Sequence, residues 1–84
     1  MIDTIKVHIT GVYGLIGNLV YKHLGQWPER YELYGSGRRQ ASSRRADEDV
    51  RVEMPDEHFS IADISDAHAV DRALEGMDAV LHIA

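Results

Sequence analysis

With 84 residues, the chain has room for one small domain, and 44% of its residues are hydrophobic, as in an ordinary globular protein. It has no cysteine, which excludes a disulfide framework and thiolate metal ligands and fits a cytoplasmic protein. The net charge of −5 argues against nucleic acid as a partner, and no stretch approaches the roughly 20 apolar residues of a membrane span.

The predicted elements alternate between strand and helix. They are a strand at 4–10, a helix at 15–24, a strand at 31–36, a polar surface loop at 38–57 with a short strand or turn near 50–54, a strand at 59–63, a helix at 66–76 and a strand at 78–84. This order predicts an α/β fold, a Rossmann-type parallel sheet with helices on both faces. Residues 5–9 and 79–83 are predicted to be apolar strands buried on both sides.

Three glycines, Gly11, Gly14 and Gly17, lie between the first predicted strand and the first predicted helix. Free N–H groups and the helix dipole make such a junction an anion site. Gly11 is predicted to make the tight turn, Gly14 to let a diphosphate approach, and Gly17 to bring the helix close to the first strand. With the helix-opening residues Leu15 and Ile16, they form the predicted dinucleotide site; three glycines in a loop by chance are the alternative.

Gly14 is also expected to need a positive φ, which β-branched residues resist. The substitution Gly14→Val is therefore predicted to abolish nucleotide binding, because its side chain would fill the space of the diphosphate.

The segments TGVYGLIG (10–17), ADIS (62–65) and VLHIA (80–84) together resemble the extended short-chain dehydrogenases/reductases, the NAD(P)-dependent epimerase/dehydratase family. The resemblance implies that Asp63 hydrogen-bonds the adenine amino group with help from the backbone of Ile64, and that Ala84 lies at the cofactor. From the residues alone, Asp63 could instead only cap or turn the chain before the next helix. The resemblance identifies no substrate.

The end of the second predicted strand bears on the choice of cofactor. NAD is usually held there by a carboxylate, whereas the 2′-phosphate of NADP needs positive charge. Gly37 stands at that position, followed by Arg38 and Arg39, while Glu32 lies at the wrong end of the strand. NADP is therefore predicted in preference to NAD, with Arg38 as the main contact and Arg39 assisting. In the alternative interpretation, both arginines merely begin a solvated loop.

The histidines are interpreted as structural. Their spacing is not that of metal ligands, so no metal site is predicted. His8 and His82 lie inside predicted apolar strands, where a histidine is more often a hydrogen-bonded core residue than a catalyst.

The groups for catalysis are missing. The resemblance implies a tyrosine acid/base with a lysine four residues later, and none of the four tyrosines has one. We therefore expect residues 1–84 to be the inactive N-terminal part of a dinucleotide-binding domain, with the catalytic and substrate-binding parts beyond residue 84. A homodimer through those parts is left open.

The complete protein is expected to be an oxidoreductase or an epimerase/dehydratase that acts by hydride transfer on a sugar nucleotide, a sugar or another alcohol or ketone. A non-catalytic NAD(P)-binding redox sensor or scaffold is the alternative. A stand-alone module of 84 residues is the weaker option, because the outer flank of the fourth strand would be an uncovered apolar edge.

Overall fold

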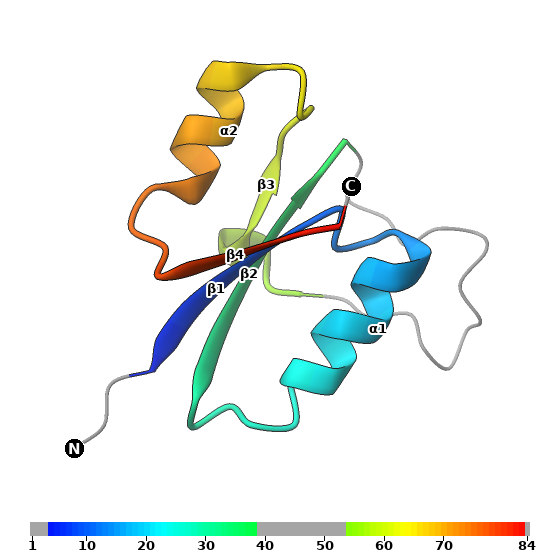
Figure 1. Cartoon of the computed structure of the whole chain (residues 1–84), viewed down its shortest axis with the longest axis vertical. Helices are drawn as coiled ribbons and strands as arrows, with labels where there is room; N and C mark the ends of the chain where they lie inside the picture. The colour runs from blue at the N-terminus through cyan, green and yellow to red at the C-terminus, as the bar shows by residue number, and fades with distance from the viewer. Residues whose placement is uncertain (1–3, 39–53, 84) are drawn as a thin grey trace.

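The computed structural model describes residues 4–38 and 54–83. It contains the strands β1 (Ile5–Thr10), β2 (Tyr31–Gly37), β3 (Phe59–Ile61) and β4 (Ala79–His82), the helices α1 (Leu15–Leu24) and α2 (Ala67–Leu74), and a 3-10 turn η1 (Asp56–His58). The strands form one parallel sheet in the order β3-β2-β1-β4. Figure 1 shows α1 and α2 on opposite sides of this sheet. The predicted α/β, Rossmann-like fold is confirmed.

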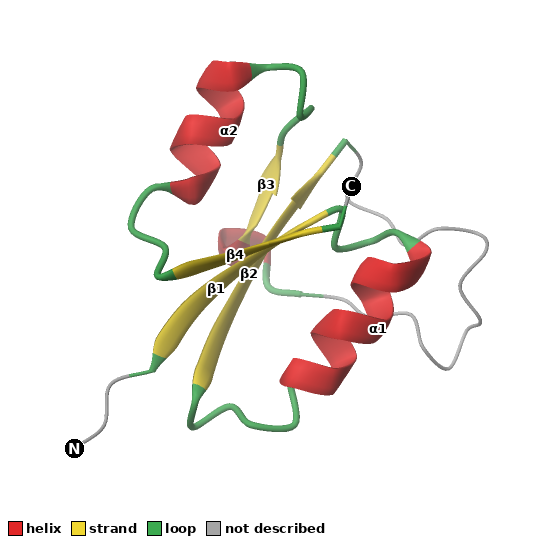
Figure 2. Cartoon of the chain, in the orientation of Figure 1, coloured by secondary structure: helices red, strands yellow, loops and turns green. Residues whose placement is uncertain are grey.

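The direction of the chain explains why the helices separate. The connection through α1 steps from β1 to β2, whereas the connection through α2 returns from β3 across the sheet to β4 (Figure 2). Crossovers between parallel strands are right-handed, so two crossovers that run in opposite directions place their helices on opposite faces. We name these faces the α1 face and the α2 face.

The element bounds differ from the prediction by one or two residues: α2 covers Ala67–Leu74 and not 66–76, β4 covers Ala79–His82 and not 78–84, and β3 is shorter than the predicted 59–63. This strand ends at Ile61, two residues early, because Asp63 accepts a hydrogen bond from the Ser65 amide and turns the chain. The side chain of Asp66 then caps α2 by accepting from the Ala69 amide at 3.2 Å. Of the short strand considered near 50–54, only Met54 lies within the described residues, and it is buried outside any strand.

The α1 face of the sheet holds the apolar core. Val7, Ile9 and Leu33 are buried there with Val12 and Met54, and α1 packs on this cluster. The other face of β1 carries Lys6, His8 and Thr10 instead. Residues 7–10 are all buried, so β1 is buried on both sides there, as predicted. The predicted burial is wrong for Ile5 and Lys6, which are exposed, and the strand is not apolar on both faces because side chains alternate between them.

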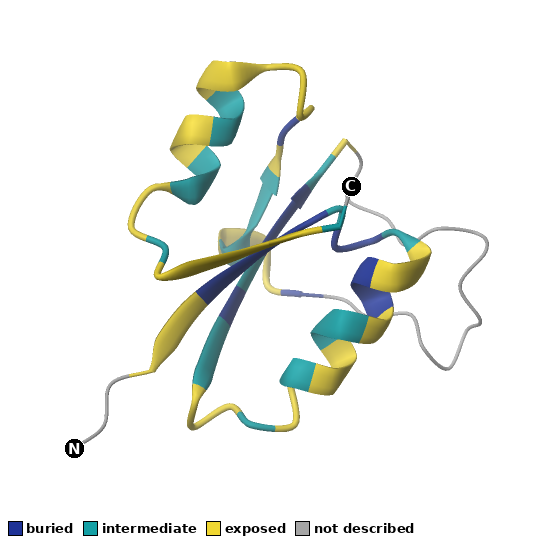
Figure 3. Ribbon diagram, in the orientation of Figure 1, coloured by how far each residue is buried: buried dark blue, intermediate teal, exposed yellow. Residues whose placement is uncertain are grey.

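The prediction that 79–83 is buried on both sides is also wrong. All four residues of β4 are exposed, as Figure 3 shows along the whole strand. Within the described residues, β4 pairs with β1 alone, so its other edge has no neighbour. His82 is consequently exposed and not part of the core, although its imidazole Nδ1 lies 2.9 Å from Thr10 Oγ1. His8 is buried and hydrogen-bonded, as predicted.

In the described part of the chain, neither helix is long and apolar enough to cross a membrane. The histidines and carboxylates of that part do not gather into a group of three or more that could hold a metal ion.

Candidate functional site

The C-terminal ends of the four strands meet at one edge, because all strands are parallel. This edge is where α/β sheets bind their ligands. The glycines after β1, Arg38 after β2 and Asp63 after β3 all lie along it. The structure thus brings together predicted site residues from three separate segments. Arg39 and Ala84 lie outside the described residues.

The glycine turn, residues 11–14, connects β1 to α1. Gly11 has a φ of 65°, in the left-handed region that favours glycine, and its carbonyl accepts from the Gly14 amide at 2.9 Å. A Cβ at Gly17 would overlap the Gly11 carbonyl oxygen and stand 2.7 Å from Val12 Cα. Gly17 therefore lets α1 approach the turn itself, rather than the strand as predicted.

Gly14 differs from the prediction in its backbone conformation. Its φ is −72° and its ψ 175°, which is extended backbone that any residue adopts. The expected positive φ is wrong, because the reversal of the chain occurs at Gly11. A Cβ at Gly14 would lie 3.2 Å from the Gly11 carbonyl oxygen, a tight contact that a small shift would relieve. Without a side chain, Gly14 leaves open space in front of the first turn of α1.

The first amides of α1 are free to bind an anion. The Asn18 amide makes the first helical hydrogen bond, 2.9 Å long, to the Gly14 carbonyl. The amides of Leu15, Ile16 and Gly17 precede it and have no hydrogen-bond partner among the described residues. Unpaired N–H groups at the positive end of a helix dipole are a phosphate-binding arrangement.

Asn18 braces the glycine turn from the core side and was not predicted as a site residue. Its side chain is fully buried, and its Nδ2 donates to the carbonyls of Tyr13 at 2.9 Å and Gly14 at 2.7 Å. In the sequence, Asn18 could have been noticed only as a single amide side chain among the apolar residues of the first predicted helix. Its role depends on carbonyl positions that only the folded turn creates.

Thr10 connects the glycine turn to the end of β4. Its hydroxyl accepts from the Ile83 amide at 3.0 Å and shares a hydrogen bond with the His82 ring. Thr10 is the last residue of β1, so these bonds hold the beginning of the turn against the neighbouring strand.

Asp63 turns the chain before α2, which was the alternative to adenine contact in the sequence analysis. Its Oδ1 accepts from the Ser65 amide at 2.9 Å and from the Ser65 hydroxyl at 2.8 Å. These two bonds lower the pKa of the Asp63 carboxyl, and the positive charge of Arg38 lowers it further. The carboxylate is therefore ionised at neutral pH, with Arg38 close enough to act on it. Ile64, the next residue, has an exposed side chain.

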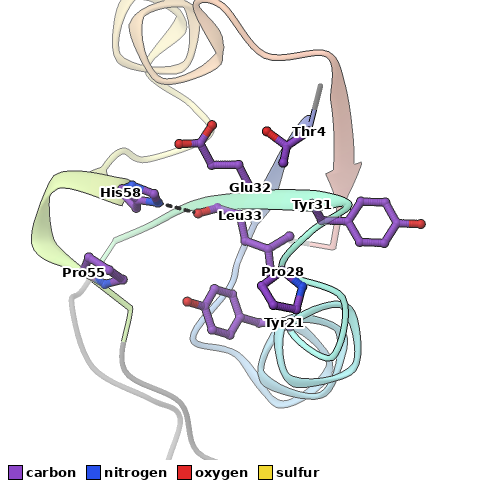
Figure 4. A pocket seen from close by; sticks show the side chains of 9 residues that line it. Thr4, Tyr21, Pro28, Tyr31, Glu32, Leu33, Pro55 and His58 are labelled. Carbon is purple, nitrogen blue, oxygen red and sulfur yellow. Dashed lines mark hydrogen bonds between the residues drawn. The ribbon is translucent and has the colours of Figure 1, made fainter. Parts of the chain in front are cut away.

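A hollow of about 500 Å³ lies at the other end of β2 (Figure 4). It is lined by Thr4, Tyr21, Gly25, Pro28, Tyr31, Glu32, Leu33, Pro55 and His58. None of the predicted site residues lines it. Glu32 pairs in register with Lys6, near the beginning of both strands, so its carboxylate is remote from the glycine turn, as predicted.

Comparisons with known proteins agree with this geometry. The model of the family described as "NAD dependent epimerase/dehydratase family" matches residues 7–84. A sanguinarine reductase from Eschscholzia californica is 34% identical over 77 residues, which cover 92% of this chain and 26% of the reductase. The chain thus spans about a quarter of the length of that curated relative. No solved structure matches the chain significantly.

Proposed function

Since this chain belongs to the NAD dependent epimerase/dehydratase family, we propose that the C-terminal edge of its sheet binds a nicotinamide dinucleotide. The start of α1 carries the proposal. Three unpaired amides lie there beside a turn that has no room for a Cβ at Gly17. This arrangement suits a diphosphate, which is large, doubly charged and best held by backbone N–H groups at close approach.

The diphosphate and the adenine of the dinucleotide each have proposed partners. The amides of Leu15, Ile16 and Gly17 hold the diphosphate. The ionised carboxylate of Asp63 accepts a hydrogen bond from the adenine amino group, and the backbone of Ile64 assists. When bound, the nicotinamide gives or takes a hydride.

We propose a preference for NADP over NAD. Arg38 follows the last residue of β2, and its charge acts on Asp63, which supports a position at the adenine end of the cofactor. The carboxylate that β2 does carry, Glu32, is at the opposite end of the strand. A guanidinium can donate two parallel hydrogen bonds to a 2′-phosphate, and Arg39 follows directly in the sequence.

The proposed activity of the whole protein is hydride transfer to or from an alcohol or ketone, in the cytoplasm. The name of the relative, a reductase, favours reduction among the reactions of this family. The acid/base residues and the substrate site are proposed to lie outside these 84 residues, because none of the tyrosines here has the lysine partner.

The test is a titration of the full-length protein with NADPH and NADH, followed by cofactor fluorescence. NADPH is expected to bind more tightly. The substitution Arg38→Ala removes one charged phosphate contact, which costs about 1.5–3 kcal/mol for NADPH and little for NADH. Arg30→Ala is the matched control, since Arg30 is an exposed arginine just before β2, at the opposite edge.

Three outcomes would overturn parts of the proposal. Failure to bind either cofactor would refute the dinucleotide site. Tighter binding of NADH, or an equal loss for both cofactors in Arg38→Ala, would refute the role of Arg38. Tight binding without oxidation of NADPH by any member of a carbonyl panel would refute the catalytic role and favour a sensor or scaffold.

A further inference from the structure

His8 is buried on the α2 face of the sheet, beside the buried side chain of Ser36. Its side chain is 1% exposed, and its Nε2 lies 2.9 Å from Ser36 Oγ. Its Nδ1 is buried and has no hydrogen-bond partner. A buried polar atom without a partner destabilises a fold, so packing alone does not account for an imidazole here.

The partner of His8 is also the residue that holds the glycine turn. The carbonyl oxygen of Ser36 accepts from the amides of Gly11 at 2.9 Å and Val12 at 3.3 Å. Ser36 is 5% exposed and stands next to the last residue of β2. One residue thus connects the imidazole on the α2 face to the first two amides of the turn.

We propose that Ser36, held by His8, is a positioning residue for the diphosphate of the bound dinucleotide. The hydrogen bond from the imidazole keeps the end of β2 against β1, and the Ser36 carbonyl then sets the position of the Gly11 and Val12 amides. Because α1 rests directly on these two residues, the free amides at its start move with them. This inference rests on the proposed function.

The protonation state of His8 fits this role. Burial lowers the pKa of the ring, so it is neutral at physiological pH. A neutral ring that donates from Nε2 to the Ser36 hydroxyl leaves only a bare acceptor at Nδ1. The other tautomer would bury an N–H group without an acceptor, which is the rarer and more costly arrangement.

The experiment compares two ligands of the full-length protein. NADP uses the glycine turn, whereas adenosine 2′-phosphate lacks the diphosphate and reaches only the adenine end of the site. Ser36→Ala is expected to weaken NADP roughly three- to tenfold, the effect of one neutral hydrogen bond. The affinity for adenosine 2′-phosphate is expected to change by less than about twofold on the same grounds. Ser60→Ala, at the residue of β3 in register with Ser36, is the control and should change neither affinity.

A double variant separates positioning from stability. His8→Leu combined with Ser36→Ala removes both polar partners, so the free energy of unfolding should equal or exceed that of the wild type. The loss of NADP affinity is expected to persist in this stable protein. Wild-type NADP affinity in the double variant, or an equal loss for both ligands in Ser36→Ala, would overturn the inference. Failure of the wild type to bind NADP would instead refute the proposed function.

Discussion

The α1 face and the α2 face are built on the same strands by different chemistry. On the α1 face, Val12 and Met54 pack so closely on β2 that a Cβ at Gly35 would lie 2.6 Å from Val12 Cγ1 and 3.1 Å from Met54 Sδ. On the α2 face, His8 and its neighbours make side-chain hydrogen bonds instead. The comparison indicates that apolar packing on one face supplies stability, while hydrogen bonds on the other hold the strand ends that form the site.

The largest expected effect comes from Gly17→Ala, where α1 meets the glycine turn. The new Cβ would overlap backbone atoms that no rotamer change can move. We expect a loss of about 3 kcal/mol or more in the free energy of unfolding, together with loss of dinucleotide binding. Chemical denaturation and cofactor titration of the full-length protein measure both. Gly25→Ala is the control, because Gly25 has a helical φ of −63° and its Cβ would come no closer than 3.1 Å, to the Tyr21 carbonyl oxygen. Wild-type stability in Gly17→Ala would contradict the close contact.

The two faces can be compared directly by making the same substitution, valine to alanine, once on each face. Val7→Ala, on the α1 face at 5% exposure, should lower the free energy of unfolding by about 2 kcal/mol. Val80→Ala, at 43% exposure on β4, should change it by less than about 0.5 kcal/mol. Denaturant titration of the full-length protein measures both losses. Equal losses would mean that the chain outside the described residues buries Val80 as deeply as Val7.

Because His8 is buried, the stability of the fold is expected to fall at acid pH. Burial lowers the pKa of folded His8 below its usual 6.5, so only the unfolded state takes up the proton as the pH falls through 6.5. The free energy of unfolding should therefore decrease below pH 6.5, by at most about 1.4 kcal/mol per pH unit from this residue. His8→Leu should remove that part of the slope, measured by denaturation between pH 5 and 8. An identical slope in the variant would show that His8 titrates normally.

The smallest expected effect concerns the start of α2. Asp66→Ala removes the side-chain cap on the Ala69 amide and should cost about 1 kcal/mol of stability. Dinucleotide affinity should stay the same, because α2 lies away from the glycine turn (Figure 1) and the Asp63 carboxylate accepts its hydrogen bonds from Ser65. Asp71→Ala, at an exposed position within the same helix, is the control. Weaker cofactor binding in Asp66→Ala would show that α2 also positions the site.

The sequence by itself determined the order of strands and helices and the place of the glycine turn. These depend on local patterns: β-branched runs, helical spacing and glycines at fixed intervals. The bounds of α1 agree with the prediction because Gly25 ends its apolar pattern. Asp63 and Arg38 could be selected in the same way, since parallel strands place their ends at one edge whatever packs around them.

Only the tertiary structure decided how deeply each strand is buried and which polar groups meet. Whether His82 is buried depends on what lies beside β4, and the pairing of His8 with Ser36 depends on a register between strands 28 residues apart. The conformation of Gly14 follows from where the chain reverses, which is Gly11. Such properties come from contacts distant in the sequence, and a local pattern carries no information about them.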